Sequence, residues 1–307
     1  MKVLVTACVL VALLLAAPAQ ATWSGEAGAI AFVRKPMGAQ FGTTDIWIET
    51  PTGRQRRLTA TPEVTETQPA FSPDGRAIAY VRRAGEGDSD IWLMKSDGSG
   101  KRPLVERASV DEQQPSFFPG GRSLVFTAFR DQWQVFSIRR NGTGRKLRAR
   151  NATDPAISPD GRHLAYSQVQ PTGGIRLLDL RTRRLRKLTS RTAQELDFSP
   201  DGRELVFSAN RRCRPGGSVH AAILTVDLRN GTERFLRRDC AHGYGDPVWS
   251  PGGMRILCAA REVVHRKVRS RLELMTAKGR PAKGAPLHRA GTLEFAPDWQ
   301  PLPGGTR

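Results

Sequence analysis

The sequence holds few of the residues that most often carry out catalysis or bind metal ions. Among its 307 residues are four cysteines and five histidines, and the histidines are scattered along the chain without a recurring partner. There is no G-x-S-x-G nucleophile elbow, no H-E-x-x-H zinc motif, no phosphate-binding P-loop and no G-x-G-x-x-G dinucleotide fingerprint. We therefore expect no catalytic residues, no metal ligands and no cofactor.

Long apolar segments are missing from most of the chain. The one at residues 3–17 follows a lysine and precedes small residues up to Ala21, a pattern typical of a signal peptide. Cys8 lies inside the apolar segment and not at the cleavage point, which argues against a lipid anchor. We expect residues 1–21 to be removed on export. Residues 22–307 would then form one monomeric domain, periplasmic or extracellular and not integral to a membrane.

Acidic residues are scarce relative to basic ones. The chain carries 48 lysines and arginines against 29 aspartates and glutamates, a formal net charge of +19 at pH 7. Such a surface attracts polyanions. Nucleic acid is not an expected partner of an exported protein, so the charge favours an anionic wall polymer or a lipid surface. The alternative is that the arginines, which are spread through the whole chain, reflect the base composition of the gene.

A six-residue motif recurs along the chain and is cleanest as Phe-Ser-Pro-Asp-Gly-Arg at residues 71–76. A proline marks each of the six copies, and successive prolines are 40 to 51 residues apart. The marking prolines are Pro73, Pro119, Pro159, Pro200, Pro251 and Pro297. This spacing is typical of the blades of a β-propeller and not of helical repeats.

The second repeat shows the order of strands within one blade. β-Favouring residues at 68–72, 77–81, 90–94 and 102–105 predict four strands, and the Pro-Asp-Gly and Asp-Gly sequences between them predict tight turns. The same order recurs in the other repeats. The sequence therefore predicts an all-β fold, a six-bladed β-propeller of four-stranded antiparallel blades.

The two ends of the chain predict how the ring closes. The first repeat opens with its second strand near Ile30, whereas residues 292–298 form a first strand that no further repeat follows. We expect this C-terminal strand to complete blade one, because closure removes the exposed edges of the sheet.

These repeats resemble those of TolB-like β-propellers over residues 28–301. The likeness rests on the repeated motif, on Asp-Ile-Trp-Leu-Met-Lys-Ser-Asp-Gly-Ser-Gly at 90–100 and on Pro-Asp-Trp-Gln-Pro at 297–301. The resemblance implies a six-bladed periplasmic or secreted protein, and TolB itself binds protein partners in a cell-envelope complex. We expect this chain to lack the separate N-terminal α/β domain of TolB. Similar repeats form the propeller of prolyl-oligopeptidase-like enzymes, whose hydrolase domain has no counterpart here.

A polar residue lies five positions before each marking proline, at the start of each expected innermost strand. These residues are Gln68, Gln114, Asp154, Glu195, Asp246 and Thr292. A rim of carboxylates at the mouth of the channel would bind a cation or a basic segment of a partner protein, because charge at a narrow opening concentrates counter-ions. The alternative is that these residues solvate the channel entrance or cap backbone groups there.

An apolar residue lies two positions before each marking proline. We expect this set to pack in the core between blades: Phe71, Phe117, Ile157, Phe198, Trp249 and Phe295.

Basic residues recur in the loops expected between the second and third strands, beginning with Arg34 in the first repeat. Arg82 with Arg83 and Arg211 with Arg212 are the pairs we assign to contacts with a polyanion. The alternative is that these arginines are solvated loop charge without a partner.

Two cysteines are expected on one face of blade five. In an oxidising compartment Cys213 and Cys240 would form a disulfide and shape the segment that carries His242 and Tyr244, which we predict to contact a partner. A zinc site that uses Cys213, Cys240 and His242 is an alternative, although the spacing matches no compact ligand motif. Cys258 lies within an expected strand and is predicted to be a buried thiol.

Taken together, these features predict a non-enzymatic exported binding module at the cell envelope. It would engage a protein or peptidoglycan-associated partner through the face that carries the channel mouth. One alternative is a basic propeller that binds anionic wall polymers or lipid surfaces. Another is a metal-dependent hydrolase of the lactonase type, since fold alone does not decide function.

Overall fold

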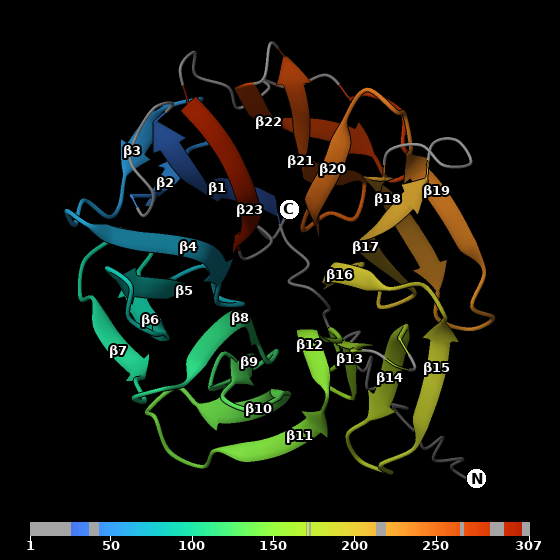
Figure 1. The fold of residues 1–307 in the computed structure, drawn as a ribbon, viewed down its shortest axis with the longest axis horizontal. Helices are drawn as coiled ribbons and strands as arrows, with labels where there is room; N and C mark the ends of the chain where they lie inside the picture. The colour runs from blue at the N-terminus through green and yellow to red at the C-terminus, as the bar shows by residue number, and fades with distance from the viewer. Residues whose placement is uncertain are drawn as a thin grey trace, which may run out of the picture.

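The described part of the chain is built of β-strands around a central channel. The computed structural model describes residues 26–36, 43–169, 171, 173–212, 219–264, 267–282 and 292–302. These residues form 23 strands, which assemble into six sheets arranged as blades (Figure 1). The predicted six-bladed all-β propeller is therefore confirmed. The predicted signal peptide, residues 1–21, lies outside the described residues, within which no helix could span a membrane.

Each blade begins at the channel and adds strands outward. Blades one to three contain β23 (Thr292–Leu302), β1 (Glu26–Pro36), β2 (Asp45–Glu49), β3 (Gln55–Arg57); β4 (Val64–Phe71), β5 (Ala77–Ala84), β6 (Ser89–Lys95), β7 (Arg102–Val105); β8 (Asp111–Phe117), β9 (Ser123–Phe129), β10 (Trp133–Arg139), β11 (Lys146–Arg150). Blades four to six contain β12 (Ala152–Ile157), β13 (His163–Gln168), β14 (Ile175–Asp179), β15 (Leu185–Thr189); β16 (Ala193–Phe198), β17 (Glu204–Arg212), β18 (Val219–Asp227), β19 (Glu233–Arg237); β20 (Gly243–Trp249), β21 (Arg255–Val264), β22 (Lys267–Thr276). In blade six the described residues supply three strands.

The repeated motif forms the turn between the first and second strands of a blade. Ser72 Oγ donates to Asp74 Oδ1 at 2.5 Å and accepts a hydrogen bond from the N–H of Ala77, while Gly75 takes a φ of 66°. The same serine–aspartate contact recurs at Ser158 and Ser199. The motif is a structural turn, because its side chains bond to one another and to their own backbone.

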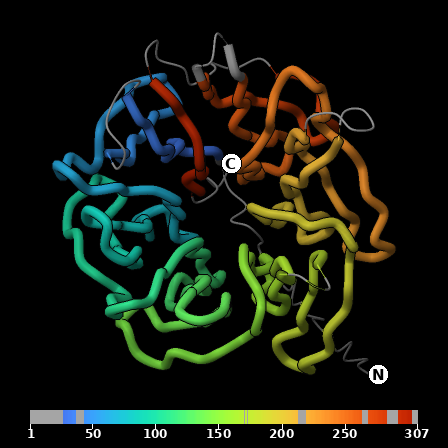
Figure 2. The backbone as a smooth tube through the Cα atoms, viewed as in Figure 1, coloured from blue at the N-terminus to red at the C-terminus, as the bar shows by residue number. Residues whose placement is uncertain are grey.

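The C-terminal strand closes the ring as predicted. Strand β23 pairs with β1 in blade one, and Figure 2 shows the red C-terminal strand beside the blue N-terminal one. Its predicted alignment with the other innermost strands is wrong by four residues, however. In blade two the β-bulge of the innermost strand lies between Thr67 and Ala70, and in β23 it lies between Phe295 and Asp298.

This register changes two equivalences. Ala296, not Thr292, corresponds to Gln68, and Trp299, not Phe295, corresponds to Phe71. The strand contains two prolines four residues apart, and the true counterpart of Pro73 is Pro301.

The hydrophobic core lies between neighbouring blades. The apolar residue ahead of the Ser-Pro turn, or its counterpart, is buried in every blade: Phe71, Phe117, Ile157, Phe198, Trp249 and Trp299. Each packs with strands of the adjacent blade, as Phe117 does with Val81 and Leu93. This packing fixes the innermost strands around the channel and so positions the side chains that line it.

Candidate binding pocket in the central channel

Each innermost strand carries a β-bulge that turns one residue toward the next blade. These bulge residues have φ angles between 46° and 58°, the left-handed region that side chains rarely adopt. They are Gln68, Gln114, Asp154, Glu195, Asp246 and Ala296. Five of the six residues predicted at the channel mouth are thus brought to equivalent positions, but in the middle of the innermost strands and not at their start.

The bulge side chains join neighbouring blades. In four successive blades the side chain accepts a hydrogen bond from the backbone N–H of the next bulge residue, at N···O distances of 2.6 to 2.9 Å. The pairs, with the acceptor first, are Gln68 and Gln114, Gln114 and Asp154, Asp154 and Glu195, and Glu195 and Asp246. These side chains therefore cap backbone groups, one of the two roles suggested by the sequence.

The series changes character at blade six and blade one. Asp246 accepts a hydrogen bond from Arg261 Nη2 at 2.7 Å, and Ala296 has no side-chain acceptor to offer. A second position, two residues after the bulge, supplies further acceptors in blades five and one. Asp197 Oδ2 accepts from the N–H of Trp249 at 2.7 Å, and Asp298 Oδ2 accepts from the N–H of Phe71 at 2.5 Å.

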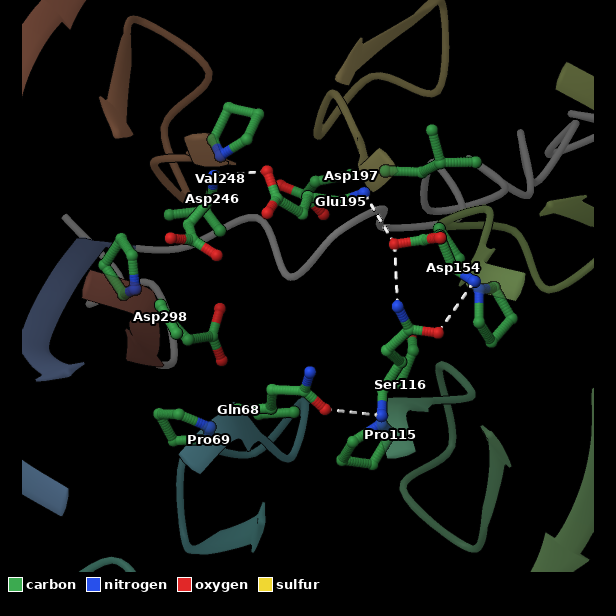
Figure 3. A pocket seen from close by; sticks show the side chains of 18 of the residues that line it. Gln68, Pro69, Pro115, Ser116, Asp154, Glu195, Asp197, Asp246, Val248 and Asp298 are labelled. Atoms are coloured by element: carbon green, nitrogen blue, oxygen red, sulfur yellow. Dashed lines mark hydrogen bonds between the residues drawn. The ribbon is translucent and has the colours of Figure 1, made fainter. Parts of the chain in front are cut away.

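The bulge residues line a pocket of about 260 Å³ in the channel, together with the residues that follow them in each innermost strand. Five prolines form much of its wall: Pro69, Pro115, Pro155, Pro247 and Pro297. Five carboxylates from blades four, five, six and one also line it: Asp154, Glu195, Asp197, Asp246 and Asp298. In Figure 3 these carboxylates line one side of the pocket, opposite Gln68 and Pro115, so it combines an apolar wall with concentrated negative charge.

Burial raises the pKa of four of these carboxyl groups. Burial raises the pKa of Asp197 to about 8, against the opposing effect of its backbone hydrogen bonds, and the nearby carboxylate of Asp298 adds to the rise. Burial likewise raises the pKa of Asp298 to about 7. Burial and the carboxylate of Asp246 raise the pKa of Glu195, and burial raises that of Asp154. A positive ligand in the pocket would reverse these shifts, because a cation favours the ionised form.

The pocket offers acceptors for a cationic ligand and few other reactive groups. Among the described residues that line it there is no histidine, cysteine or lysine. Among the residues that the structure describes, no group of three or more His, Cys, Asp or Glu side chains is placed to hold a metal ion. What the arrangement can do chemically is to neutralise and hydrogen-bond an ammonium or guanidinium group against an apolar wall.

The segment predicted to contact a partner in blade six lies differently from expectation. Tyr244 lies in strand β20, is 3% exposed and packs in the hydrophobic core. Its hydroxyl group donates a hydrogen bond to Asp239. The expectation that Tyr244 lies at the surface is therefore wrong. The strand begins one residue before it, which turns its side chain inward. His242 stays partly exposed, with Nδ1 3.0 Å from Asp239 Oδ1 and Nε2 3.5 Å from Glu262.

The cysteines are only partly described. Cys240 is disulfide-bonded, but Cys213 lies outside the described residues, so their pairing stays a prediction. Cys258 is a buried free thiol, as expected.

The basic residues assigned to a polyanion lie at strand ends and not in open loops. Arg82 stacks over Trp92 with its guanidinium carbon 4.6 Å from the ring centre, and Arg83 is exposed beside it in β5. Arg211 donates to the carbonyl of Arg238, and Arg212 ends β17.

Arg34 was assigned to the same basic set, and the expectation that it lies in a surface loop is wrong. It is 3% exposed and pairs with the buried Glu294 at 2.8 Å. Arg34, Arg82 and Arg211 are therefore engaged within the fold.

Sequence reasoning missed Asp197 and Asp298. Both lie three residues before the proline of a Ser-Pro or Gln-Pro turn, at a position that holds alanine, serine or valine in the other blades. An alignment of the repeats with the correct register of β23, compared at the position two residues after the bulge, would have revealed them.

Comparisons with known proteins agree with this architecture. A family model described as the TolB beta propeller domain matches residues 15–216. No curated protein matches the chain. The fold is similar to that of TolB from Acinetobacter baumannii, with a TM-score of 0.74 at 21% identity over 89% of this chain and 67% of that one.

Two further solved structures are similar in fold. The putative TolB from Agrobacterium tumefaciens has a TM-score of 0.65 at 17% identity, over 91% of this chain and 100% of that one. Hydrazine synthase from Kuenenia stuttgartiensis has a TM-score of 0.70 at 14% identity, over 91% of this chain and 48% of that one. At these identities the likeness shows the fold alone, and an enzyme among them means that the fold does not decide activity.

Proposed function

The chain belongs to the TolB β-propeller family, and on that premise we propose that it is an exported, non-enzymatic binding module of the cell envelope. Its central pocket binds a cationic segment of a protein or peptidoglycan-associated partner. The observation that carries the proposal is the convergence of five carboxylates from four blades on one pocket with a proline-rich wall. The predicted periplasmic or extracellular location is part of the same proposal.

The charge of the pocket fits a lysine or arginine side chain. Asp197 and Asp298 each use one carboxylate oxygen to bond a backbone N–H. An ammonium or guanidinium group would share the remaining acceptor capacity and replace the bound proton. Binding would therefore release protons, and affinity for a cationic ligand would rise as the pH increases from 6 to 8.

The experiment measures binding of a fluorescent oligolysine peptide by fluorescence anisotropy. The variant Asp197→Asn/Asp298→Asn keeps both hydrogen-bond acceptors and removes both charges. We expect it to weaken binding by at least about tenfold, because each charge-assisted contact contributes on the order of 1.5–3 kcal/mol. It should also reduce the rise in affinity with pH, which Asp154 and Glu195 would still produce in part.

A matched variant separates the pocket from the general field of the protein. Asp160→Asn/Asp201→Asn removes two exposed turn carboxylates and the same amount of charge. Its affinity should stay within about twofold of the wild type, since exposed charges are screened by solvent. Equal weakening in the two variants, or no weakening in the pocket variant, would exclude the pocket as the site.

A further inference from the structure

The outer side of the ring is joined at seams. A seam is the contact between the outermost strand of one blade and the hairpin that joins the third and fourth strands of the next. In four seams an arginine of the outermost strand donates a hydrogen bond to a backbone carbonyl of that hairpin. The pairs are Arg56 with Asp97, Arg102 with Arg140, Arg186 with Leu228 and Arg229, and Arg234 with Ala277.

The same four seams share a second feature. Two residues after the arginine comes a leucine, and its carbonyl oxygen faces a glycine of the hairpin with a positive φ. A Cβ added to these glycines would lie 2.7 to 3.5 Å from that oxygen. The pairs are Leu58 with Gly98, Leu104 with Gly142, Leu188 with Gly231, and Leu236 with Gly279. Glycine is favoured here by both the tight space and the backbone conformation.

The seam between blades three and four departs from this plan at all three positions. Lys146 replaces the arginine, Arg148 replaces the leucine and Arg183 replaces the glycine. Arg183 has a φ of 60°, and its N–H bonds to the carbonyl of Asp179 as that of Gly231 does to Asp227. The hairpin geometry is therefore retained although the residue is unsuited to it.

These replacements place two cations close together, one of them in a strained backbone conformation. A residue other than glycine in the left-handed region is strained, and such strain is found most often at functional positions. Arg148 is half-buried, and burial together with the charge of Arg183 lowers its pKa. Its Nε donates to the buried hydroxyl of Ser137 at 2.8 Å, where blades one, two and four carry Ile48, Leu93 and Leu177.

The stretch of sequence that supplies both sides of this seam is strongly basic. Residues 139–187 contain 13 lysines and arginines and three acidic residues. Of those acids, Asp154 is buried in the channel, while Asp160 and Asp179 bond to the backbone of their own turns. No ion pair in the described part of the chain involves Lys146, Arg148 or Arg183.

We propose that the seam between blades three and four binds the phosphate groups of an anionic polymer. Two neighbouring guanidinium groups, Arg148 and Arg183, can donate to different oxygens of one phosphate. Further exposed cations along β11 and β15, such as Arg150 and Lys187, would contact the following phosphates of the chain. This site is distinct from the channel pocket, because β11 and β15 lie on the outer wall (Figure 1) and the ligand is an anion and not a cation.

The experiment restores the plan of the other seams. The variant Arg148→Leu/Arg183→Gly is compared with Arg54→Gln/Arg76→Gln, which removes the same charge from exposed positions on blades one and two. The probe is linear polyphosphate, and its affinity is measured by calorimetry at several salt concentrations. We expect the seam variant to bind at least about tenfold more weakly and with a shallower dependence on salt, while the control loses less than about threefold.

Thermal unfolding of the same proteins provides a second readout. The seam variant should have a higher Tm than the wild type, because it removes a strained residue and a like-charge contact. Unchanged affinity for polyphosphate would overturn the proposal at any Tm, and a lower Tm beside it would show the replacements to be structural.

Three further results would also overturn it. These are equal loss of affinity in the control, no binding of polyphosphate by the wild type at low salt, and binding of phosphatidylglycerol vesicles without binding of polyphosphate. Orthophosphate that binds as tightly as polyphosphate would exclude a polymer as the ligand.

Discussion

The inner and outer rings of this propeller join the same blades with opposite chemistry. At the channel, the backbone presents N–H groups to the preceding blade, and side chains such as Asp154 and Glu195 accept their hydrogen bonds. At the outer seams, hairpins present carbonyl groups, and arginines such as Arg56 and Arg102 donate to them. Unpaired N–H groups at the channel therefore favour side chains that accept hydrogen bonds, and unpaired carbonyl groups at the outer wall favour side chains that donate them.

This difference explains part of the charge distribution of the molecule. Carboxylates gather in the channel because acceptors are needed there, and arginines recur on the wall because donors are needed there. The net charge of +19 is thus not wholly a matter of base composition, because several arginines have a structural role at the seams. A function beyond joining the blades is better sought at residues that depart from this pattern of structural acceptors and donors. These residues are Asp197, Asp298, Arg148 and Arg183.

The largest change in unfolding free energy is expected at the closure of the ring, where a cation and a carboxylate are buried together. Arg34→Met removes the guanidinium that pairs with Glu294 at 2.8 Å, and both side chains are almost fully buried. We expect unfolding free energy to fall by about 3–5 kcal/mol, as for other buried pairs that lose one partner. Urea denaturation monitored by tryptophan fluorescence measures the change.

Arg82→Met provides the matched comparison. Arg82 pairs in register with the buried Glu66 in blade two but is only half-buried over Trp92. Its loss should cost about 1 kcal/mol, because solvent screens the remaining charge. Equal costs for the two variants would show that burial is not what distinguishes the closure.

The second effect is a dependence of stability on pH that originates in the channel. The folded protein keeps a proton on Asp197 up to a pKa of about 8 and on Asp298 up to about 7, whereas the unfolded chain loses both protons near pH 4. The folded state therefore binds more protons between these limits. The stabilisation is complete below pH 4 and is lost progressively as the pH rises from 4 through 7 or 8, by up to about 1.4 kcal/mol per pH unit for each group.

Asp197→Asn/Asp298→Asn should flatten this decline between pH 5 and pH 8. Asp239 supplies a contrast of opposite sign: burial opposes its ionisation, but hydrogen bonds from Tyr244 and His242 lower its pKa to about 2. Its contribution is present above pH 4 and is lost as the pH falls toward 2. Asp239→Asn should therefore alter only the acid limb, and urea denaturation across the pH range separates the two.

The third effect tests the inner hydrogen-bond series at Asp154, which has a φ of 52° and accepts from the N–H of Glu195. Asp154→Gly removes the acceptor and keeps the backbone conformation, so it should cost about 1–3 kcal/mol for an unpaired buried N–H. Asp154→Ala should cost somewhat more, because alanine is strained at this φ. Asp154→Asn keeps an acceptor and tolerates the conformation, and a loss as large as that of the glycine variant would contradict the role of the hydrogen bond.

The repeat spacing was enough to predict the blades, the closing strand and five of the bulge residues, because each is marked by a copy of the repeated motif nearby in the sequence. The register of β23 was wrong because Pro297 and Pro301 both fit the marking proline, and only pairing with β1 decides between them. Tyr244 was expected at the surface because the start of β20 cannot be located from glycines alone. The seams were not predicted, since each joins residues about 40 positions apart, such as Leu58 and Gly98.

The smallest effect is expected at the outer ring, where the donors are exposed. Arg186→Lys removes the forked contact with the carbonyls of Leu228 and Arg229, because an ammonium group cannot reach both in the same geometry. We expect a loss of about 0.5–1 kcal/mol. The reverse exchange, Lys146→Arg, would supply the missing donor to the hairpin of blade four and add a few tenths of a kcal/mol, near the value of an exposed contact.

A double-mutant cycle with Arg183→Gly sharpens that comparison. If repulsion from Arg183 is what keeps an arginine from seating at position 146, the gain from Lys146→Arg should increase when Arg183 is removed. Additive changes in unfolding free energy would mean that the two positions act independently. The departure of this seam from the other four would then consist of separate replacements and not of one coupled set.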